Sequence, residues 1–476
     1  MFRSWASSTF ESLSNPQFRV LWAGTLFSTL AYMMMFVVQS VVAFNLAGTS
    51  SAVGLVMLGV GVSMFVVGPF GGVIADRVNR RQLIILGQGF GALMLFLTGV
   101  LIVVDLLTLE LLVLLTLLLG LSFAFMGPAR QAFVGEIVGP KLLPNAVALS
   151  LLAHSFGQPF SPMLAGVLLE TFVGAGGTYI LMGSLVTLGV LTVATIRPSV
   201  RRPSRVQRSM STELKEGLNH VRRNPRVRLL LILFISIVVL GFLFRVLLPA
   251  FLERHLDREP TEMGLLLLVN GGAAAVVSLL LAGAVGSRWA WPILFLLTAG
   301  MGVGYVLLSQ AQTFNAALLT MLLLGPGLQG PILIAQSQIM MYTEPAYYGR
   351  VMSLTMMAWG LQAVIGFPIG ALADSIGERD VLLLIGLATF VVAALGLGAW
   401  LAMRRRFEEG GGRGDAGAGA ALGGRGDDRA ENAVRAVISG QGLHPRRASA
   451  GELEQSARFV NHSNADHGTD GGSGGE

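Results

Sequence analysis

Long apolar stretches recur along the whole chain, and they restrict its fold more than any other feature. Each is about 20 residues or longer, enough for a helix to cross the ~30 Å hydrocarbon core of a bilayer. We count twelve, with approximate bounds at 18–45, 51–74, 82–104, 108–129, 144–169, 177–196, 228–252, 262–285, 290–309, 314–342, 351–373 and 380–402. This pattern predicts an all-α integral membrane protein with twelve transmembrane helices.

The composition agrees with a membrane protein, because only 13% of the residues are charged and the mean hydropathy is +0.68. Soluble proteins are roughly a quarter charged. The sequence lacks the short alternating strands of outer-membrane barrels, so we expect helices that satisfy their own backbone groups. The chain has no cysteine, no metal-ligand cluster and no nucleotide motif. We therefore expect no disulfide, metal, cofactor or nucleic-acid partner.

The Lys and Arg residues of the short loops gather on one side of the predicted membrane. That side receives Arg77, Arg80 and Arg81, the segment before the seventh span, Arg350 and the arginines at 404–406, whereas the other receives only Arg254, Arg258 and Arg379. Positive charge is enriched in cytoplasmic loops. We expect a multi-pass protein of the cell (inner) membrane with both termini in the cytoplasm.

Two sequence repeats divide the spans into two sets of six. The segment "NPQFRVL" at 15–21 reappears as "NPRVRLL" at 224–230, each just before a long apolar span. A second match aligns "AVALSLL" with "RVMSLTM" and places Glu170 opposite Asp374. The sequence therefore predicts two homologous six-helix halves.

The predicted domains follow from these repeats: an N-terminal bundle over 1–197, a basic cytoplasmic linker over 198–227, a second bundle over 228–407, and a tail over 408–476. In the linker, "STELKEGLNHVRR" can form a short amphipathic helix along the membrane surface. The tail is rich in Gly and has too few large apolar residues to support a core, so we expect it to be disordered.

The segment "GGVIADRVNRRQLI" at 71–84 places a Gly-led charged group between the second and third spans. It fits the loop signature G-x-L-A-D-R-x-G-R-K-x-x-L of the major facilitator superfamily, with Ile74 and Asn79 in place of Leu and the second Gly. The chain resembles this family over residues 15 to about 405. Residues 127–150 and 349–360 are similar to the bacterial exporters that include enterobactin and macrolide efflux proteins.

The resemblance implies two pseudo-symmetric bundles and a cytoplasmic gate. Asp76 would meet the positively polarised start of helix eleven near Arg350, and the loop arginines would pair with carboxylates or carbonyls, or only fix the topology. Arg130 would join Asp76 or Glu136, or snorkel to the interface. The gating residues expected on this basis are Gly72, Asp76, Arg77, Arg80, Arg81, Arg130 and Arg350.

The resemblance also implies that helices one, four, seven and ten line a central cavity. This selects Gln39, Arg245, Gln329 and Gln336 as substrate contacts, with Trp359 among the apolar walls. Arg245 would attract an anionic or polar group, or snorkel outward. Adaptable apolar walls with scattered amides suit a bulky amphipathic solute. We expect a secondary active exporter that works by alternating access on a small molecule.

The interiors of the predicted spans contain no Asp or Glu, so a buried carboxylate is not available for proton coupling. His154 titrates near neutral pH and stands one turn before Gln158, which makes the two residues the candidates for coupling to a proton gradient. The alternative is a histidine that only packs in its helix. Asp76 and Glu136 are the other titratable candidates, at the inner gate.

Two functions from other classes compete with transport. One is a transport-silent sensor or scaffold that uses the basic linker and the tail. The other is an intramembrane hydrolase in which Ser63 and His154 pair as nucleophile and base, although no orienting group accompanies them. We expect no enzymatic activity and a monomer in the lipid bilayer.

Overall fold

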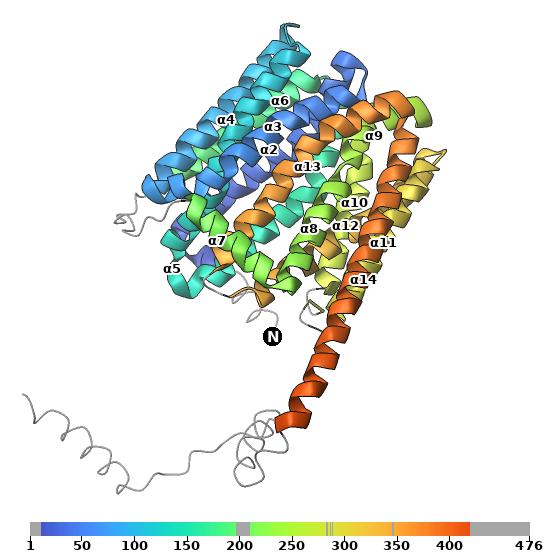
Figure 1. The fold of residues 1–476 in the computed structure, drawn as a ribbon. Helices are drawn as coiled ribbons and strands as arrows, with labels where there is room; N and C mark the ends of the chain where they lie inside the picture. The colour runs from blue at the N-terminus through green and yellow to red at the C-terminus, as the bar shows by residue number, and fades with distance from the viewer. Residues whose placement is uncertain are drawn as a thin grey trace, which may run out of the picture. The chain divides into compact units, whose positions relative to one another are not determined.

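The computed structural model describes residues 11–196, 210–281, 284–285, 287, 289–344 and 347–418, and all regular structure in these residues is helical (Figure 1). Ten helices of this part are long and apolar enough to cross a membrane, and Leu109–Phe123 is a shorter apolar helix. The predicted all-α membrane fold is confirmed. Residues 408–418 of the predicted tail belong to α14, and the tail beyond residue 418 lies outside the described residues.

The first half contains six membrane-crossing segments in five assigned helices. A short 3-10 turn, η1 (Glu11–Ser14), precedes them. The helices are α2 (Pro16–Ala47), α3 (Ser50–Arg77), α4 (Arg80–Val103), α5 (Leu109–Glu170) and α6 (Gly174–Thr195). Helix α5 supplies two of the six segments, because it contains a reversal at Gly139.

The linker and the second half follow in the same order. The elements are α7 (Met210–Arg223), α8 (Pro225–Phe242), α9 (Phe244–Leu256), η2 (Pro260–Glu262), α10 (Met263–Leu281), α11 (Ala290–Ser309), α12 (Phe314–Tyr342), α13 (Tyr348–Ile376) and α14 (Glu378–Ala418). Helices α8 and α9 together form the seventh segment. Both halves belong to one compact unit that ends at Arg404.

The repeated Asn-Pro pair begins each half in the same way. The Asn15 side chain caps α2 by accepting from the backbone N–H groups of residues 17 and 18, and Asn224 caps α8 in the same manner. Each Pro occupies the first turn, where its missing N–H costs nothing. The Asn15 amide also donates to the carbonyl of Ile137 at 3.1 Å, and the Asn224 amide donates to that of Tyr342 at 3.1 Å. The repeat therefore ties the first segment of each half to the end of its fourth.

The reversal inside α5 takes a single residue. The sequence predicts two spans separated by residues 130–143, but the helix continues to Gly139, where φ is 71° and ψ is 174°. Glycine has no Cβ and adopts this positive φ without steric cost, and Pro140 suits the first turn of the next arm. The second arm runs back along α2, since the Trp22 indole donates to the carbonyl of Leu149 at 2.9 Å.

We call the end of the bundle with Gly139, α7 and the start of α2 the linker end, and the opposite end, with the turns at Gly48, Asp257 and Gly377, the far end. One hydrophobic cluster contains residues of both halves, such as Met34 and Phe251. A second cluster contains only first-half residues near the linker end, including Phe18 and Phe133. The two halves thus share a core, while the linker end of the first half has a core of its own.

Two glycine-lined seams bring the halves into backbone contact. Helix α3 packs along α13, and a Cβ placed on Gly54 would lie 2.5 Å from the carbonyl oxygen of Gly366. Helix α5 packs along α10, and a Cβ on Gly264 would lie 2.5 Å from the carbonyl oxygen of Pro162. Small residues permit this close approach of helices in a membrane. The seams carry the loops of the two halves toward each other at the far end.

The Gly139 reversal yields a test of the fold. Gly139→Ala should lower the stability of the protein by roughly 1–3 kcal/mol, because a Cβ is strained at positive φ. Gly135→Ala is the matched control, since it lies in the helical part of α5 and its Cβ would meet only Leu143, at 3.7 Å. Helix propensity should make the control neutral or slightly stabilising. Thermal unfolding of the purified protein measures both; equal effects would show that Gly139 does not form the reversal.

Candidate functional site

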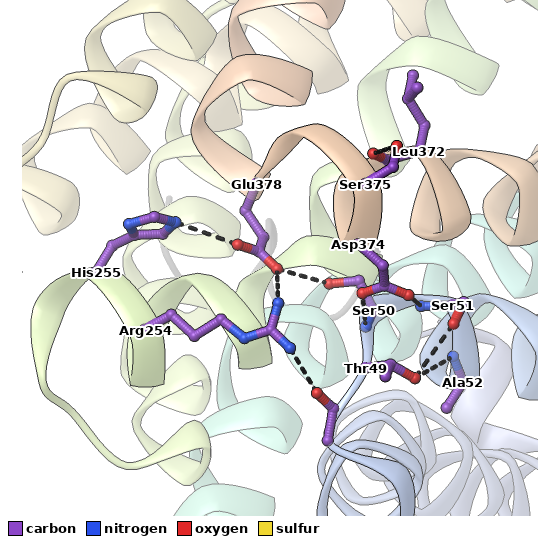
Figure 2. Close-up of polar contacts among 11 residues, drawn as sticks. Thr49, Ser50, Ser51, Ala52, Arg254, His255, Leu372, Asp374, Ser375 and Glu378 are labelled. Carbon is purple, nitrogen blue, oxygen red and sulfur yellow. Dashed lines mark hydrogen bonds and ion pairs between the residues drawn. The ribbon is translucent and has the colours of Figure 1, made fainter.

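A carboxylate of the second half caps a helix of the first half at the far end. Asp374, in the last turn of α13, accepts hydrogen bonds from the backbone N–H groups of Ser50 at 2.7 Å and Ser51 at 2.8 Å (Figure 2). These amides open α3 and have no partner within the helix. The positive end of the helix dipole also favours an anion at this position. Asp374 thus attaches α13 to the start of α3.

Glu378 lies beside Asp374 and is 1% exposed. Its Oε1 atom accepts from Nη1 of Arg254 at 2.8 Å and from the hydroxyl of Ser50 at 3.2 Å, and its Oε2 atom lies 3.1 Å from Nε2 of His255. Figure 2 shows the carboxylate between these side chains. Buried carboxylates are costly unless paired and hydrogen-bonded. Arg254 and His255, from the end of α9, supply that pairing.

Arg254 also reaches the first half. Its Nη2 atom donates to the carbonyl oxygen of Gly48 at 2.6 Å, at the end of α2. Gly48 has a φ of 65°, the left-handed conformation that commonly ends a helix. The guanidinium is therefore placed between a carboxylate of one half and the negatively polarised helix end of the other.

A second contact joins the other pair of seam helices. The Thr261 hydroxyl, just before α10, donates to Oε1 of Glu170 at 2.7 Å. Glu170 is the last residue of α5, and Asp374 lies in the last turn of α13. The two carboxylates therefore occupy equivalent places in the two halves. Each meets the start of the second segment of the opposite half. We call this set the far-end cluster: Gly48, Ser50, Ser51, Glu170, Arg254, His255, Thr261, Asp374 and Glu378.

The far-end cluster is not among the predicted site residues, although two features of the sequence indicate it. The internal repeat aligned Glu170 with Asp374, and Arg254 was one of three arginines on the side poor in positive charge. Another of these three, Arg379, donates to the carbonyl of Ala311 at 2.9 Å. Arg254 and Arg379, which lie on the side poor in positive charge, thus both donate hydrogen bonds to acceptors within the protein.

At the linker end, the loop arginines bind within the first half. Nη1 of Arg80 lies 2.8 Å from Oε1 of Glu136 on α5, with both side chains largely buried. Arg81 donates to the carbonyls of Val193 at 3.3 Å and Ala194 at 2.5 Å, at the end of α6. Cations at a helix C-terminus are favourable. These contacts hold α4, α5 and α6 together.

Three of the predicted gating residues lie at the end of α3. The backbones of Gly72, Asp76 and Arg77 belong to the last two turns of that helix. The side chains of Asp76 and Arg77 are not among those that the structure describes. The expected contact of Asp76 with the start of α13 therefore stays a prediction. Arg130 lies in α5 with its Nε and Nη2 atoms enclosed and without a hydrogen-bond partner among the described residues.

Arg350 binds the linker helix. Its Nη1 atom lies 2.9 Å from Oε2 of Glu216 on α7, and its guanidinium lies 5.1 Å from the ring centre of Tyr347. His220 of α7 stacks on the same ring with the ring centres 4.4 Å apart. These contacts attach α7 to the start of α13.

Two of the predicted substrate contacts, Arg245 and Trp359, share Phe242 as a neighbour. The guanidinium of Arg245 lies 4.6 Å from the ring centre of Phe242, which lies 5.0 Å from that of Trp359. Of the remaining amides, Gln39 of α2 is buried, whereas Gln329 and Gln336 of α12 are half-buried. Of the proton-coupling candidates, Gln158 is half-buried on α5, and the side chain of His154 lies outside the described residues.

Comparisons with known proteins agree on one family. The profile of the Major Facilitator Superfamily matches residues 21–367. The enterobactin exporter EntS of Shigella boydii serotype 18 is 26% identical over 383 residues, which cover 78% of this chain and 87% of the relative. EntS of Escherichia coli O81 matches to the same extent, with 26% identity over 383 residues.

Solved structures show the same fold at low identity. The nucleoside transporter NupG has a TM-score of 0.67 and 13% identity, covering 81% of this chain and 99% of that one. A POT family transporter in complex with a thioalcohol-conjugated peptide has a TM-score of 0.63 and 13% identity, covering 80% of this chain and 95% of that one. Both resemblances concern the fold alone.

The burial of Glu378 yields a prediction for the far-end cluster. Glu378→Gln keeps the shape of the side chain but removes the charge that Arg254 and His255 face, and should cost roughly 1–3 kcal/mol of stability. Glu253→Gln is the control, because Glu253 is an exposed carboxylate adjacent to Arg254. Thermal unfolding in detergent compares the two variants. A Glu378→Gln protein as stable as the control would show that this ion pair does not stabilise the joined halves.

Proposed function

We propose that this chain, which belongs to the major facilitator superfamily, is a secondary active exporter of bulky, amphipathic small molecules. It is a multi-pass membrane transporter and not an enzyme. Transporters with two homologous halves move substrate by rocking one half against the other around a central site. The proposed mechanism is such alternating access.

The far-end cluster is the observation that carries this proposal. Alternating access needs contacts between the halves that close one end and can be broken without damage to either half. The bonds of Asp374 to α3 and of Thr261 to Glu170 meet this need, because they join helix termini through hydrogen bonds that water can replace. The equivalent places of the two carboxylates support a motion that follows the symmetry of the repeat.

The direction of transport and the orientation are parts of the same proposal. The positively charged loops favour a cytoplasmic linker end, which makes the far end the outer face and the described conformation one that is closed to the outside. The relatives described above are named enterobactin exporters, and this supports efflux. The proposed energy source is a proton gradient, with His154 and Gln158, or Asp76 and Glu136, as the coupling residues.

The proposed substrate contacts are Gln39, Arg245, Gln329, Gln336 and Trp359. Their uncharged amides and aromatic surfaces suit a solute that is mostly apolar with scattered hydrogen-bonding groups. A small-molecule cargo of this kind, related in size to a siderophore or a macrolide, fits the likeness to exporters better than a sugar or an inorganic ion.

Cross-linking of the far end tests the proposal directly. The chain has no cysteine, so Glu170→Cys with Thr261→Cys introduces the only two thiols. A short bifunctional thiol reagent should join them and hold the far end closed. Export of anionic, neutral and cationic amphipathic dyes from preloaded vesicles should then fall to background for every dye the unmodified protein exports, and cleavage of a reducible cross-linker should restore it.

The two single-cysteine variants, treated with the same reagent, control for loss of the native side chains. Complete cross-linking with unchanged export would contradict alternating access at this end. Absence of export of every dye in the untreated protein, in the presence of an imposed pH gradient, would favour a transport-silent sensor instead.

A further inference from the structure

Arg245 carries a charge deep within the second half. It is the second residue of α9, which continues α8 through Leu243 with helical backbone dihedral angles. Pro249, four residues later, lacks the N–H that would bond the carbonyl of Arg245 in a regular helix. One backbone hydrogen bond is therefore missing at Arg245, and in membrane proteins such interruptions occur where the helix is buried in protein or lines a cavity.

The guanidinium of Arg245 points away from the far end. Leu256, at the far end, lies eleven positions further on, which is about 16 Å along a helix. Its guanidinium lies over Phe242, one turn toward the linker end, at 4.6 Å from the ring centre. A side chain that snorkels to the outer interface would extend in the opposite direction. The guanidinium of Arg245 therefore extends along the helix toward Phe242 and not toward the far end.

Within the described residues, no carboxylate pairs with Arg245, and its Nε atom is enclosed without a hydrogen-bond partner. The nearby hydroxyl of Tyr305 donates to the backbone carbonyls of Leu240 at 3.1 Å and Gly241 at 2.7 Å. The span interiors contain no Asp or Glu that could approach in another conformation. An aromatic face offsets only part of the cost of a charge in the membrane, so the guanidinium is left with donors for an external anion.

An aromatic surface continues from the guanidinium to the junction of the halves. Phe242 lies 5.0 Å from Trp359 of α13. The residue after Trp359 is Gly360, whose Cβ would lie 2.9 Å from the backbone of Phe65 on α3. Helix α9 itself packs against α2 and α3. The three side chains thus lie beside the region where the two halves meet.

We infer that Arg245, Phe242 and Trp359 form a subsite for the anionic, aromatic part of an amphipathic substrate. The inference rests on the proposed transport function and narrows its substrate class to organic anions. The guanidinium binds a carboxylate, sulfonate or phenolate through charge-assisted hydrogen bonds. The indole and phenyl rings bind the aromatic portion.

Two matched fluorescent probes test the subsite. 1-Anilinonaphthalene-8-sulfonate and N-phenyl-1-naphthylamine share an aromatic frame, and only the first carries a charge. Titration into the full-length protein in lipid nanodiscs, with empty nanodiscs subtracted, measures their affinities. Arg245→Gln should weaken binding of the anionic probe about tenfold or more, equivalent to about 1.4 kcal/mol, and change binding of the neutral probe less than about twofold. Trp359→Leu should weaken binding of both probes.

Arg228→Gln is the control, because Arg228 is an exposed arginine at the linker end. Arg245→Lys retains the charge without the bidentate geometry and should weaken binding of the anionic probe less than Arg245→Gln does. If the glutamine variant does not fold, the lysine variant tests the subsite in its place. Equal loss of both probes, or unchanged anion binding, would overturn the inference. Export of neutral dyes but not of anionic dyes would overturn it too while leaving the proposed transport function intact.

Discussion

The unpaired amides at the start of a helix must find an acceptor, and at the far end the acceptor belongs to the other half. Asp374 bonds the first N–H groups of α3, and Arg254 bonds the last carbonyl region of α2. The Asp374 contact lies at the end of the glycine seam that brings α3 and α13 into backbone contact. The close packing of the two halves and the polar closure of their far end are therefore a single arrangement.

Two contacts join the halves at the far end, one at Glu170 and one at Asp374. They occupy equivalent positions in the two halves, but they differ in the number of hydrogen bonds they make. Glu170 meets one hydroxyl, whereas Asp374 meets two helix amides and stands next to the buried Glu378 with its two basic partners. The two halves thus share the placement of a carboxylate at the end of the fifth segment, while the surrounding groups differ. We expect the α3–α13 side to carry most of the energy that keeps the far end closed.

Much of the fold was predictable from the sequence, because apolar length alone identifies spans and the Asn-Pro repeat identifies the halves. The position of the reversal at Gly139 was not predictable. Hydropathy indicates two spans separated by a less apolar interval, whether the turn between them takes one residue or fourteen. Of the site, Arg245 and Trp359 are predictable as polar and aromatic residues of the spans, whereas their common neighbour Phe242 is not. The far-end cluster was missed because its acids stand at span ends, where a carboxylate usually faces water. The partner of Arg350, Glu216, lies in another element, and no local pattern indicates that pairing.

The Asn-Pro repeat has a consequence for how the protein can move. Asn15 and Asn224 each fasten the first segment of a half to the end of its fourth, at the linker end and through backbone carbonyls of the same half. Neither bond crosses between the halves, so separating the halves there would leave both bonds in place. In the alternating access proposed above, each half would therefore keep its first and fourth segments joined at the linker end while the halves move apart.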